Sequence, residues 1–203
     1  PFDPVLLRAR IGACLDKKRL RDQEQVYLRR IEEEKRRADE LLHVILPHAI
    51  AEELKTTHAV RPQRHENVAV LFSDIAGFTA YCDQNPPELV IEHLQTLVRE
   101  CEDIAARHGL EKIKTIGDAF MAAGGLIDPL ENPALNCVRA ALEMTRAAEA
   151  MPCNWTMHVG IHIGPVIAGV VGRRKYMYDI WGDTVNTAAR VAGPGGPRPP
   201  QVT

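Results

Sequence analysis

The chain has 203 residues, of which 25 are Lys or Arg and 27 are Asp or Glu, so its formal net charge is −2. This near balance gives no overall attraction to nucleic acid or to an acidic membrane surface. The five cysteines are scattered without a Cys-x-x-Cys pair, which favours reduced thiols in a cytoplasmic protein over a disulfide framework. We find no apolar stretch long enough to span a bilayer and no signal-peptide pattern. Because the sequence begins with Pro1 rather than Met, we expect a fragment of a longer protein.

The N-terminal part of the sequence predicts helix. Residues 1–14 show a short helix start, with Asp3 as the cap and Pro4 as the first helical residue. Residues 15–46 are dominated by Lys, Arg, Glu and Asp and contain neither Gly nor Pro, which predicts one long helix.

A heptad repeat can be laid on residues 15–46, which would suit a parallel coiled coil. Its two seam positions hold Leu20, Tyr27 and Leu41, and Ile31, Ala38 and Ile45. The charged residues Lys17, Glu24 and Glu34 fall on the same seam and weaken it. We favour the coiled coil, and a single solvated helix stays open as the alternative.

Residues 47–66 are predicted to link this helix to a globular part. Pro47 interrupts the helix, residues 49–54 could form one more turn, and residues 56–66 are polar. We place the globular part at residues 67–203.

Strands and helices alternate in the globular part, and hairpins lie between the helices. This order predicts an α+β fold with a largely antiparallel sheet. The expected elements are a buried strand ending at Asp74, a helix over about 87–108, a hairpin turning at Gly117-Asp118, a helix over 133–150 capped by Asn132, a hairpin of 157–163 and 166–171 turning at Gly164-Pro165, a strand over 176–181, and a helix over 184–191 capped by Asp183.

Two patterns within these elements predict which side chains face the core. The helix over 133–150 is expected to turn four residues inward: Leu135, Val138, Leu142 and Thr145. In the strand over 157–163, His158 and His162 share one face. We interpret the two histidines as part of a solvated sheet face, because a metal pair would need further ligands nearby.

Two aspartates carry the first sign of chemistry. Asp74 ends an apolar run, and Asp118 lies in the tight turn of the first hairpin. Each alone could be an ordinary turn residue. If the strand lies beside the hairpin, however, two carboxylates meet at one sheet edge. Such hard oxygen ligands suit Mg²⁺ or Mn²⁺, ions that act on phosphates.

The residues that follow Asp74 strengthen this interpretation. Gly77, Phe78 and Thr79 form a strand-to-helix junction, where backbone N–H groups are available to phosphate oxygens. A metal-binding carboxylate beside such a turn indicates a nucleoside triphosphate site. It is not a Walker A loop, because the Gly-Lys-Ser/Thr ending is absent.

A second group of polar residues lies further along the chain. Asn186 and Arg190 are four residues apart and share a helical face. Arg190 offers a planar fork suited to phosphate, and Asn186 could bond a ribose oxygen. Asp179 could accept a hydrogen bond from an exocyclic amine, and Lys114 lies in the first hairpin. Each alone could be a surface charge or a helix cap.

Together these segments resemble the catalytic domain of the class III nucleotide cyclases, the adenylate and guanylate cyclases. The resemblance covers residues 46–203 and rests on residues 72–79 (FSDIAGFT), 114–118 (KTIGD) and 178–186 (YDIWGDTVN). It implies a ferredoxin-like or palm-like sheet with flanking helices. Residues 1–14 resemble the last helix of a response-regulator receiver domain. Residues 15–46 and 47–66 resemble the signalling helix and the transducer linker that precede such cyclases.

The resemblance implies a metal site and a phosphate site. Two Mg²⁺ or Mn²⁺ ions would be held by Asp74, Ile75 and Asp118. The substrate phosphates would lie against the junction that starts at Gly77. Arg174 aligns best with an arginine that binds the triphosphate, and Arg173 is the near alternative.

The resemblance also implies the nucleotide and the transition-state residues. Lys114 and Asp179 match the pair that reads the purine, where guanylate cyclases usually carry Glu and a small residue such as Cys. ATP is therefore the expected substrate. Asn186 matches the residue that orients the ribose, and Arg190 matches the residue that stabilises charge at the α-phosphate. The expected reaction forms 3′,5′-cyclic AMP and pyrophosphate.

In the family, one subunit supplies the metal ligands and the other supplies the purine and transition-state residues, so a homodimer is implied. A further strand of the family fold supplies a phosphate-binding Lys. The present sequence stops at Thr203 without a counterpart, so we expect the catalytic domain to be truncated at its C-terminus. The main alternative is a catalytically silent module for dimerisation or regulation. A diguanylate cyclase is disfavoured because its Gly-Gly-Asp/Glu-Glu-Phe hairpin is absent.

Overall fold

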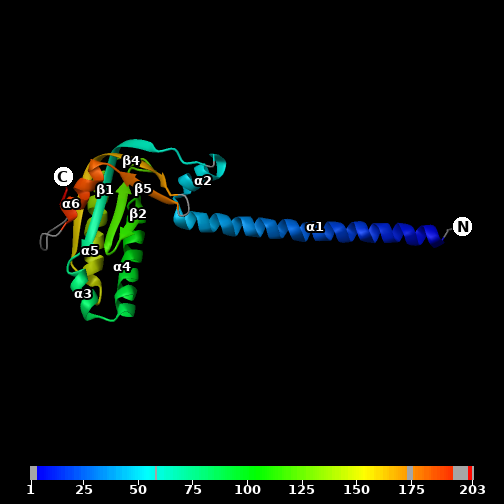
Figure 1. Ribbon diagram of the computed structural model, residues 1–203, viewed down its shortest axis with the longest axis horizontal. Helices are drawn as coiled ribbons and strands as arrows, with labels where there is room; N and C mark the ends of the chain where they lie inside the picture. Colours follow the sequence, from blue (N-terminus) through cyan, green and yellow to red (C-terminus); the bar gives the residue numbers. More distant parts are fainter. Residues whose placement is uncertain (1–3, 58, 173–175, 194–200, 203) are drawn as a thin grey trace. The chain divides into compact units, whose positions relative to one another are not determined.

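The computed structural model describes residues 4–57, 59–172, 176–193 and 201–202. It combines helices with a β-sheet, as Figure 1 shows. The chain divides into two units, Pro1–Glu52 and Glu53–Thr203. The elements are α1 (Pro4–Ile45), α2 (His48–Thr57), β1 (Gln63–Ile75), α3 (Phe78–Gln84), α4 (Pro87–Arg107), β2 (Leu110–Ile116), β3 (Ala119–Gly124), α5 (Pro133–Ala150), β4 (Met157–Val171), β5 (Met177–Trp181), α6 (Asp183–Ala192) and β6 (Gln201–Val202).

Helix α1 runs without interruption through the two segments that we predicted separately, residues 1–14 and 15–46. It begins at Pro4 as expected, whereas the predicted cap Asp3 lies outside the described residues. The large apolar residues of the predicted seam are exposed: Leu20, Tyr27, Ile31, Leu41 and Ile45. A second helix could bury this stripe, so the coiled coil stays a prediction.

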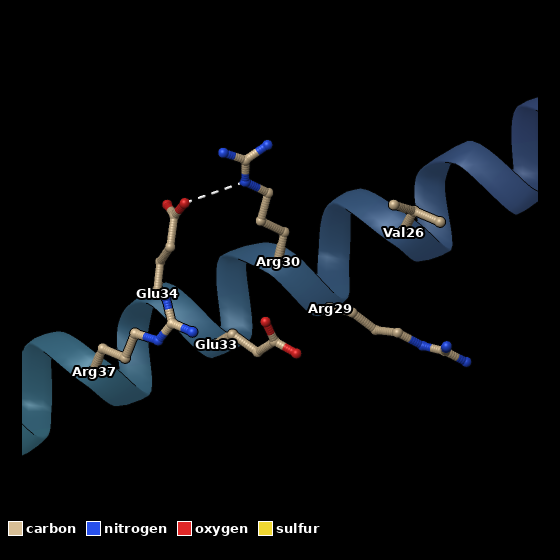
Figure 2. Close-up of a pocket in the computed structure, with 6 residues that line it drawn as sticks. All are labelled: Val26, Arg29, Arg30, Glu33, Glu34 and Arg37. Carbon is tan, nitrogen blue, oxygen red and sulfur yellow. Dashed lines mark hydrogen bonds and ion pairs between the residues drawn. The ribbon is translucent and has the colours of Figure 1, made fainter.

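The middle of α1 carries charges of both signs. Figure 2 shows the segment that contains Arg29, Arg30, Glu33, Glu34 and Arg37, with Arg30 Nε lying 3.3 Å from Glu34 Oε1. Pairs four residues apart support an exposed helix by a few tenths of a kcal/mol each, roughly 0.2–0.5. The hollow in this view is lined by side chains of α1 alone and is open to solvent.

Two elements extend into the segment that we predicted to be a linker. Helix α2 is a ten-residue helix rather than a single turn. Strand β1 starts at Gln63, inside the segment predicted to be a polar linker. The extra length has a partner, because Gln63 pairs with Ala168 and His65 pairs with Val166.

The sheet is largely antiparallel, with the strand order β2-β3-β1-β4-β5 and β6 paired in parallel with β4. Strand β1 lies at its centre, and its residues 68–73 are all buried. Such a continuous buried run is expected of a strand covered on both faces. The predicted α+β architecture, with a palm-like sheet and flanking helices, is therefore confirmed.

Strand β4 corrects one prediction. Gly164 and Pro165 do not turn the chain, because Met157–Val171 is one continuous strand. Its pairing with β1 shifts register between His65 and Val68, and Pro165 lies opposite that irregularity. Proline lacks the N–H that a regular ladder needs, so it is tolerated where the ladder is already disrupted. The hairpin in this region is formed by β4 and β5 instead.

Helices cover both faces of the sheet. Helices α4 and α5 pack together over one face, where Leu71 and Ile161 contribute to the core. Helix α6 crosses the other face at Gly160, where an added Cβ would lie 2.3 Å from Ala192 N. Only glycine permits this approach, so Gly160 fixes the distance between α6 and β4.

Helix α5 has the predicted bounds and cap, since Asn132 Oδ1 accepts a hydrogen bond from Leu135 N at 3.0 Å. The predicted inward face is wrong for Leu135 and Leu142, which are 41% and 43% exposed. The buried face consists mostly of smaller residues, which allow a closer approach than leucines would: Cys137, Ala140, Ala141 and Ala148, together with Met144.

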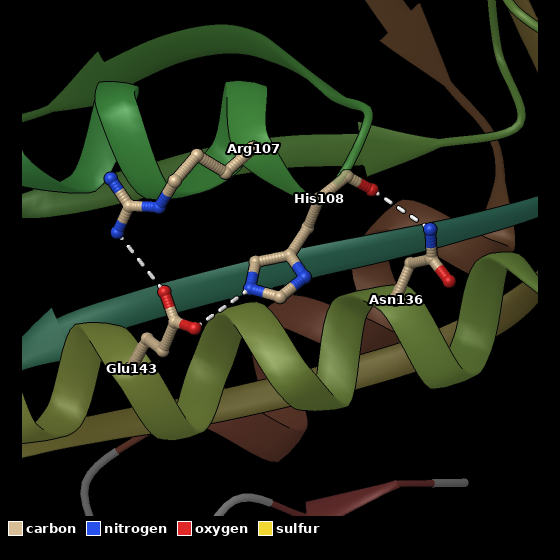
Figure 3. A network of polar contacts seen from close by, with 4 residues as sticks. All are labelled: Arg107, His108, Asn136 and Glu143. Carbon is tan, nitrogen blue, oxygen red and sulfur yellow. Dashed lines mark hydrogen bonds and ion pairs between the residues drawn. The ribbon is translucent and has the colours of Figure 1, made fainter.

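A polar network joins the end of α4 to α5, and Figure 3 shows its four residues. Arg107 Nη2 and His108 Nε2 lie 3.0 Å and 3.2 Å from the carboxylate oxygens of Glu143. Asn136 donates to the backbone oxygen of His108 at 2.9 Å. These contacts join the C-terminal end of α4 to α5.

None of the helices in the described part of the chain is long and apolar enough to cross a membrane.

Candidate active site

The structure brings Asp74 and Asp118 together, as the sequence predicted. Asp74 lies near the end of β1, and Asp118 is the second residue of the two-residue turn between β2 and β3. Gly117 has φ = 63°, which suits the first position of such a hairpin turn. Because β3 pairs with β1, the turn meets the end of β1, and Ile75 N donates to Asp118 Oδ2 at 3.2 Å.

The pKa of Asp74 lies above its ordinary value. Burial is the largest cause, followed by the negative charge of Asp118 and by a hydrogen bond between the two side chains. His158 acts in the opposite direction. Two carboxylates held this close repel each other unless a proton or a cation lies between them. Their hard oxygen atoms fit Mg²⁺ or Mn²⁺.

Asp74 and Asp118 cannot supply a full coordination shell. The described residues contain no group of three or more His, Cys, Asp or Glu side chains placed to hold a metal. Mg²⁺ characteristically takes few protein carboxylates and completes its shell with water and substrate phosphates. The pair therefore fits an ion that arrives with a phosphorylated substrate better than a permanent structural ion. The main chain of Ile75 lies directly beside the pair.

The turn after Asp74 is set by Gly77, whose φ of 73° lies in the left-handed region. It precedes α3, which begins with Phe78 and Thr79. The first N–H groups of a helix have no intrahelical acceptor, so they are available to a ligand oxygen. We expected a strand-to-helix junction here but no separate helix α3.

Aromatic packing holds α3 in place. The Trp155 ring makes edge contacts with Phe78 and Tyr81, at centroid distances of 5.9 Å and 5.1 Å. The Tyr81 hydroxyl bonds His93 Nδ1 at 2.7 Å and so ties α3 to α4. These contacts fix the junction that follows Asp74. The sequence did not reveal the cluster, because its members come from three separate segments.

Lys114 and Asp179 form an ion pair, with Lys114 Nζ 2.5 Å from Asp179 Oδ2. The side chains are 28% and 9% exposed. Asp179 Oδ1 also accepts from Ile180 N at 2.9 Å. Lys114 belongs to β2 and Asp179 to β5, the first and last strands in the order β2-β3-β1-β4-β5. The sheet therefore curls until its two ends meet at this pair.

Asn186 and Arg190 lie one turn apart on α6, and both are exposed. Arg190 Nη2 donates to Thr187 Oγ1 at 2.9 Å and lies 3.8 Å from Asp183 Oδ1. The predicted cap is wrong, because Gly182 holds the N-cap position and Asp183 is the first helical residue. A carboxylate there still interacts favourably with the helix dipole.

Comparison with known proteins identifies the family. The profile described as "Adenylate and Guanylate cyclase catalytic domain" matches residues 60–203. The chain belongs to this family.

Relatives of this chain include a peptide receptor and an adenylate cyclase. "Atrial natriuretic peptide receptor 2" of Rattus norvegicus is 37% identical over 207 residues, which cover 96% of this chain and 19% of the receptor. "Adenylate cyclase" of Mycobacterium bovis is 36% identical over 168 residues, which cover 79% of this chain and 38% of that protein. The chain thus spans about a fifth to two fifths of the length of these relatives.

Solved structures agree with this assignment. The non-canonical dimeric guanylyl cyclase domain of the RhoGC fusion protein from Blastocladiella emersonii has a TM-score of 0.59 and 31% identity. The match covers 63% of this chain and 74% of that chain. The cyclase fold is therefore supported by sequence and by structure.

The structure does not describe two of the predicted arginines, and it corrects the prediction for His158. Arg174 and Arg173 lie outside the described residues. His158 does not lie on a solvated face, because it is 9% exposed and pairs across the sheet with Asp74. The pairing of β4 with β1 could not be read from the sequence, so the proximity of His158 to Asp74 was missed.

A hollow of about 200 Å³ lies elsewhere in the cyclase domain. It is lined in part by Glu111 and Asp128, and burial together with the charge of Asp128 raises the pKa of Glu111. None of the predicted site residues lines it. The candidate site is therefore described by the two charged pairs and not by this hollow.

Proposed function

We propose that this chain is the catalytic part of an adenylate cyclase that converts ATP to 3′,5′-cyclic AMP and pyrophosphate. The observation that carries the choice of ATP is the ion pair between Lys114 and Asp179. A Lys donor suits the ring nitrogen of adenine, and an Asp acceptor suits its exocyclic amine. Guanine presents the opposite pattern at these positions, for which a Glu would serve better.

The reaction joins the ribose 3′-oxygen to the α-phosphorus and breaks the bond to the β-phosphate. Asp74, Asp118 and the main chain of Ile75 would hold two Mg²⁺ or Mn²⁺ ions, which supply activation of the hydroxyl and neutralisation of the phosphates. The junction at Gly77, Phe78 and Thr79 would bind phosphate oxygens through its N–H groups.

Residues of α6 would act at the transition state. Asn186 would orient the ribose, and Arg190 would offset the charge that develops at the α-phosphate. Arg174 would bind the triphosphate. The Arg190 side chain is exposed and bonded only within its own helix among the described residues. This is compatible with a group that meets its substrate when a second subunit is present.

We propose that the active form is a homodimer in which each site uses both subunits. Support comes from the hairpin of β4 and β5, where four large apolar side chains are exposed on one face: Ile167, Val171, Met177 and Trp181. Apolar surface gathered in this way is typical of a protein contact. Helix α1 would pair with its copy as a coiled coil and carry a signal from an upstream receiver-type domain.

The nucleotide specificity is tested by identifying the product. The protein is incubated with Mn²⁺ and either ATP or GTP, and the products are separated by chromatography. We expect cyclic AMP from ATP, and we expect Asp74→Ala to abolish it. Cyclic GMP as the main product would overturn the choice of ATP. No cyclic nucleotide from this chain or from any longer natural form of it would favour a silent regulatory module.

The shared site is tested by mixing two inactive variants. Asp74→Ala damages the metal half of a site, and Arg190→Ala damages the transition-state half. If the halves come from different subunits, a mixed dimer contains one intact site, and activity returns on mixing. Mixing two samples of the same variant serves as the control. A mixture that stays inactive although mass spectrometry shows mixed dimers would contradict the shared site.

A further inference from the structure

His158 stands out because it is buried and incompletely bonded. It lies on β4 and is only 9% exposed. Its Nε2 atom is buried and has no hydrogen-bond partner among the described residues. Buried polar atoms in folded proteins are nearly always bonded, so an unbonded one requires a specific explanation.

The neighbour of His158 across the sheet supplies that explanation. His158 and Asp74 are directly opposite in the antiparallel pair of β4 and β1. Directly opposite residues project from the same sheet face, with Cβ atoms roughly 4.5–5.5 Å apart. The two side chains also interact electrostatically. The pKa of Asp74 is raised by burial first and then by the nearby Asp118 carboxyl group, which has the same charge.

A second histidine lies four residues further along β4 on the same face. His162 is opposite Val70 in the pairing with β1, whereas His158 is opposite Asp74. His162 is also only partly buried. The structure thus provides a matched comparison within one strand.

We propose that His158 is a positioning residue for Asp74, donating an imidazole N–H to the carboxylate and fixing its orientation when a divalent ion is bound. The inference rests on the proposed metal site at Asp74 and Asp118. Carboxylates that bind metals are commonly held by such outer hydrogen bonds. Loss of one of these bonds typically lowers metal affinity about 10–100-fold.

Direct ion binding tests the proposal without catalysis. Mn²⁺ is titrated into nucleotide-free protein, and free Mn²⁺ is followed by electron paramagnetic resonance. We expect His158→Met, which keeps volume but removes the donor, to weaken Mn²⁺ binding about 10–100-fold. His158→Gln keeps an N–H donor and should stay within about threefold of wild type. His162→Met is the matched control and should bind as wild type does.

A folded His158→Met variant that binds Mn²⁺ as tightly as wild type would overturn the inference. If that variant does not fold, ¹⁵N NMR of wild-type imidazoles decides. Mg²⁺ should then shift the His158 resonances and leave those of His162 in place, and unchanged His158 resonances would overturn the inference. Product assays keep the two proposals separate. If the wild type forms cyclic AMP and His158→Met binds Mn²⁺ as the wild type does, this inference alone fails. If His158→Met weakens Mn²⁺ binding but the wild type forms no product, the proposed enzymatic function alone fails.

Discussion

Two pairs of charged side chains on the sheet and its turns behave in opposite ways. Lys114 and Asp179 carry opposite charges, lie 2.5 Å apart and complete one another within the chain. Asp74 and Asp118 carry like charges, and burial together with the charge of Asp118 raises the pKa of Asp74. The first pair is ready before any ligand arrives, whereas the second is incomplete without a cation. Under the proposed function, the difference would separate a preorganised recognition element from a catalytic element that depends on its ligands.

Removing one carboxylate should produce the largest effect. Asp74→Asn keeps the shape of the side chain but removes the charge that would hold an ion beside the substrate. We expect the rate of cyclic AMP formation to fall about 10³-fold or more, because roughly 4 kcal/mol of transition-state stabilisation is lost. The rate is measured with saturating Mn²⁺ and ATP.

Asp103→Asn serves as the control for the loss of a negative charge, because Asp103 is exposed on α4. It should leave the rate unchanged. If Asp74→Asn retained a tenth or more of the wild-type rate while folded, the carboxylate pair could not be the metal site.

Exchanging the recognition pair should alter specificity. Lys114→Met leaves Asp179 without its cation and removes the donor to adenine, so kcat/KM for ATP should fall about 10–100-fold. The double change Lys114→Glu and Asp179→Cys should shift the preference toward GTP. Both are measured as the ratio of kcat/KM for ATP to that for GTP.

The neighbouring lysine provides the control for this exchange. Lys112 lies on the same strand and is ion-paired with Glu102 on α4. Lys112→Met should therefore leave the ATP to GTP ratio as it is. A ratio that stays constant in the Lys114 and Asp179 variants would show that this pair does not read the base.

The carboxylate pair should also have a pH signature in the metal-free protein. The pKa of Asp74 is higher in the folded chain than in the unfolded chain, so the folded state binds its proton more tightly. The resulting stability is present at low pH and is lost as pH rises through the raised pKa. Asp74→Asn should thus melt above wild type at neutral pH, by about 2–4 °C for each kcal/mol regained.

This difference should vanish as pH falls toward 3.8, the ordinary value for Asp. Saturating Mn²⁺ should reverse its sign, because only the wild type gains stability from the ion. Melting is followed by circular dichroism with and without a chelator. A metal-free Asp74→Asn that melts below wild type at every pH would show that repulsion within the pair is unimportant.

The contrast between the two pairs also explains what could be predicted from the sequence. The proximity of Asp74 and Asp118 follows from local signals, a strand end and a Gly-Asp turn, joined by one strand pairing. Lys114 and Asp179 lie on strands at opposite ends of the sheet order, so only the family resemblance linked them. His158 was misjudged because strand alternation reveals which residues share a face but not what covers that face.

Packing distances account for the other errors. A leucine stripe on α5 has the right helical period for a core face, yet small residues such as Ala140 and Ala141 face the sheet. The sequence does not state how closely a helix approaches a sheet. Gly164 and Pro165 carry strong turn signals, but the register shift in β1 accommodates them within a continuous strand.

Breaking an ion pair at the surface should have the smallest effect on stability. It also tests how much burial strengthens the Lys114–Asp179 pair. Glu143 contacts Arg107 and His108 between α4 and α5, and hydrogen bonds from these two side chains lower its pKa. The stability it contributes is therefore present above its ordinary pKa of 4.5 and is lost as pH falls through the lowered value. Glu143→Gln should lower the melting temperature slightly at neutral pH and leave kcat/KM for ATP unchanged.

Solvent screens the pair of Glu143 and Arg107, whereas the Asp179 carboxylate is shielded from water. Lys114→Met should therefore destabilise the protein more than Glu143→Gln does. Melting curves of both variants at neutral pH and near pH 3 test this order. Equal losses would mean that the Lys114–Asp179 pair is no better shielded from solvent than the surface pair, and the case for a preorganised recognition element would fail.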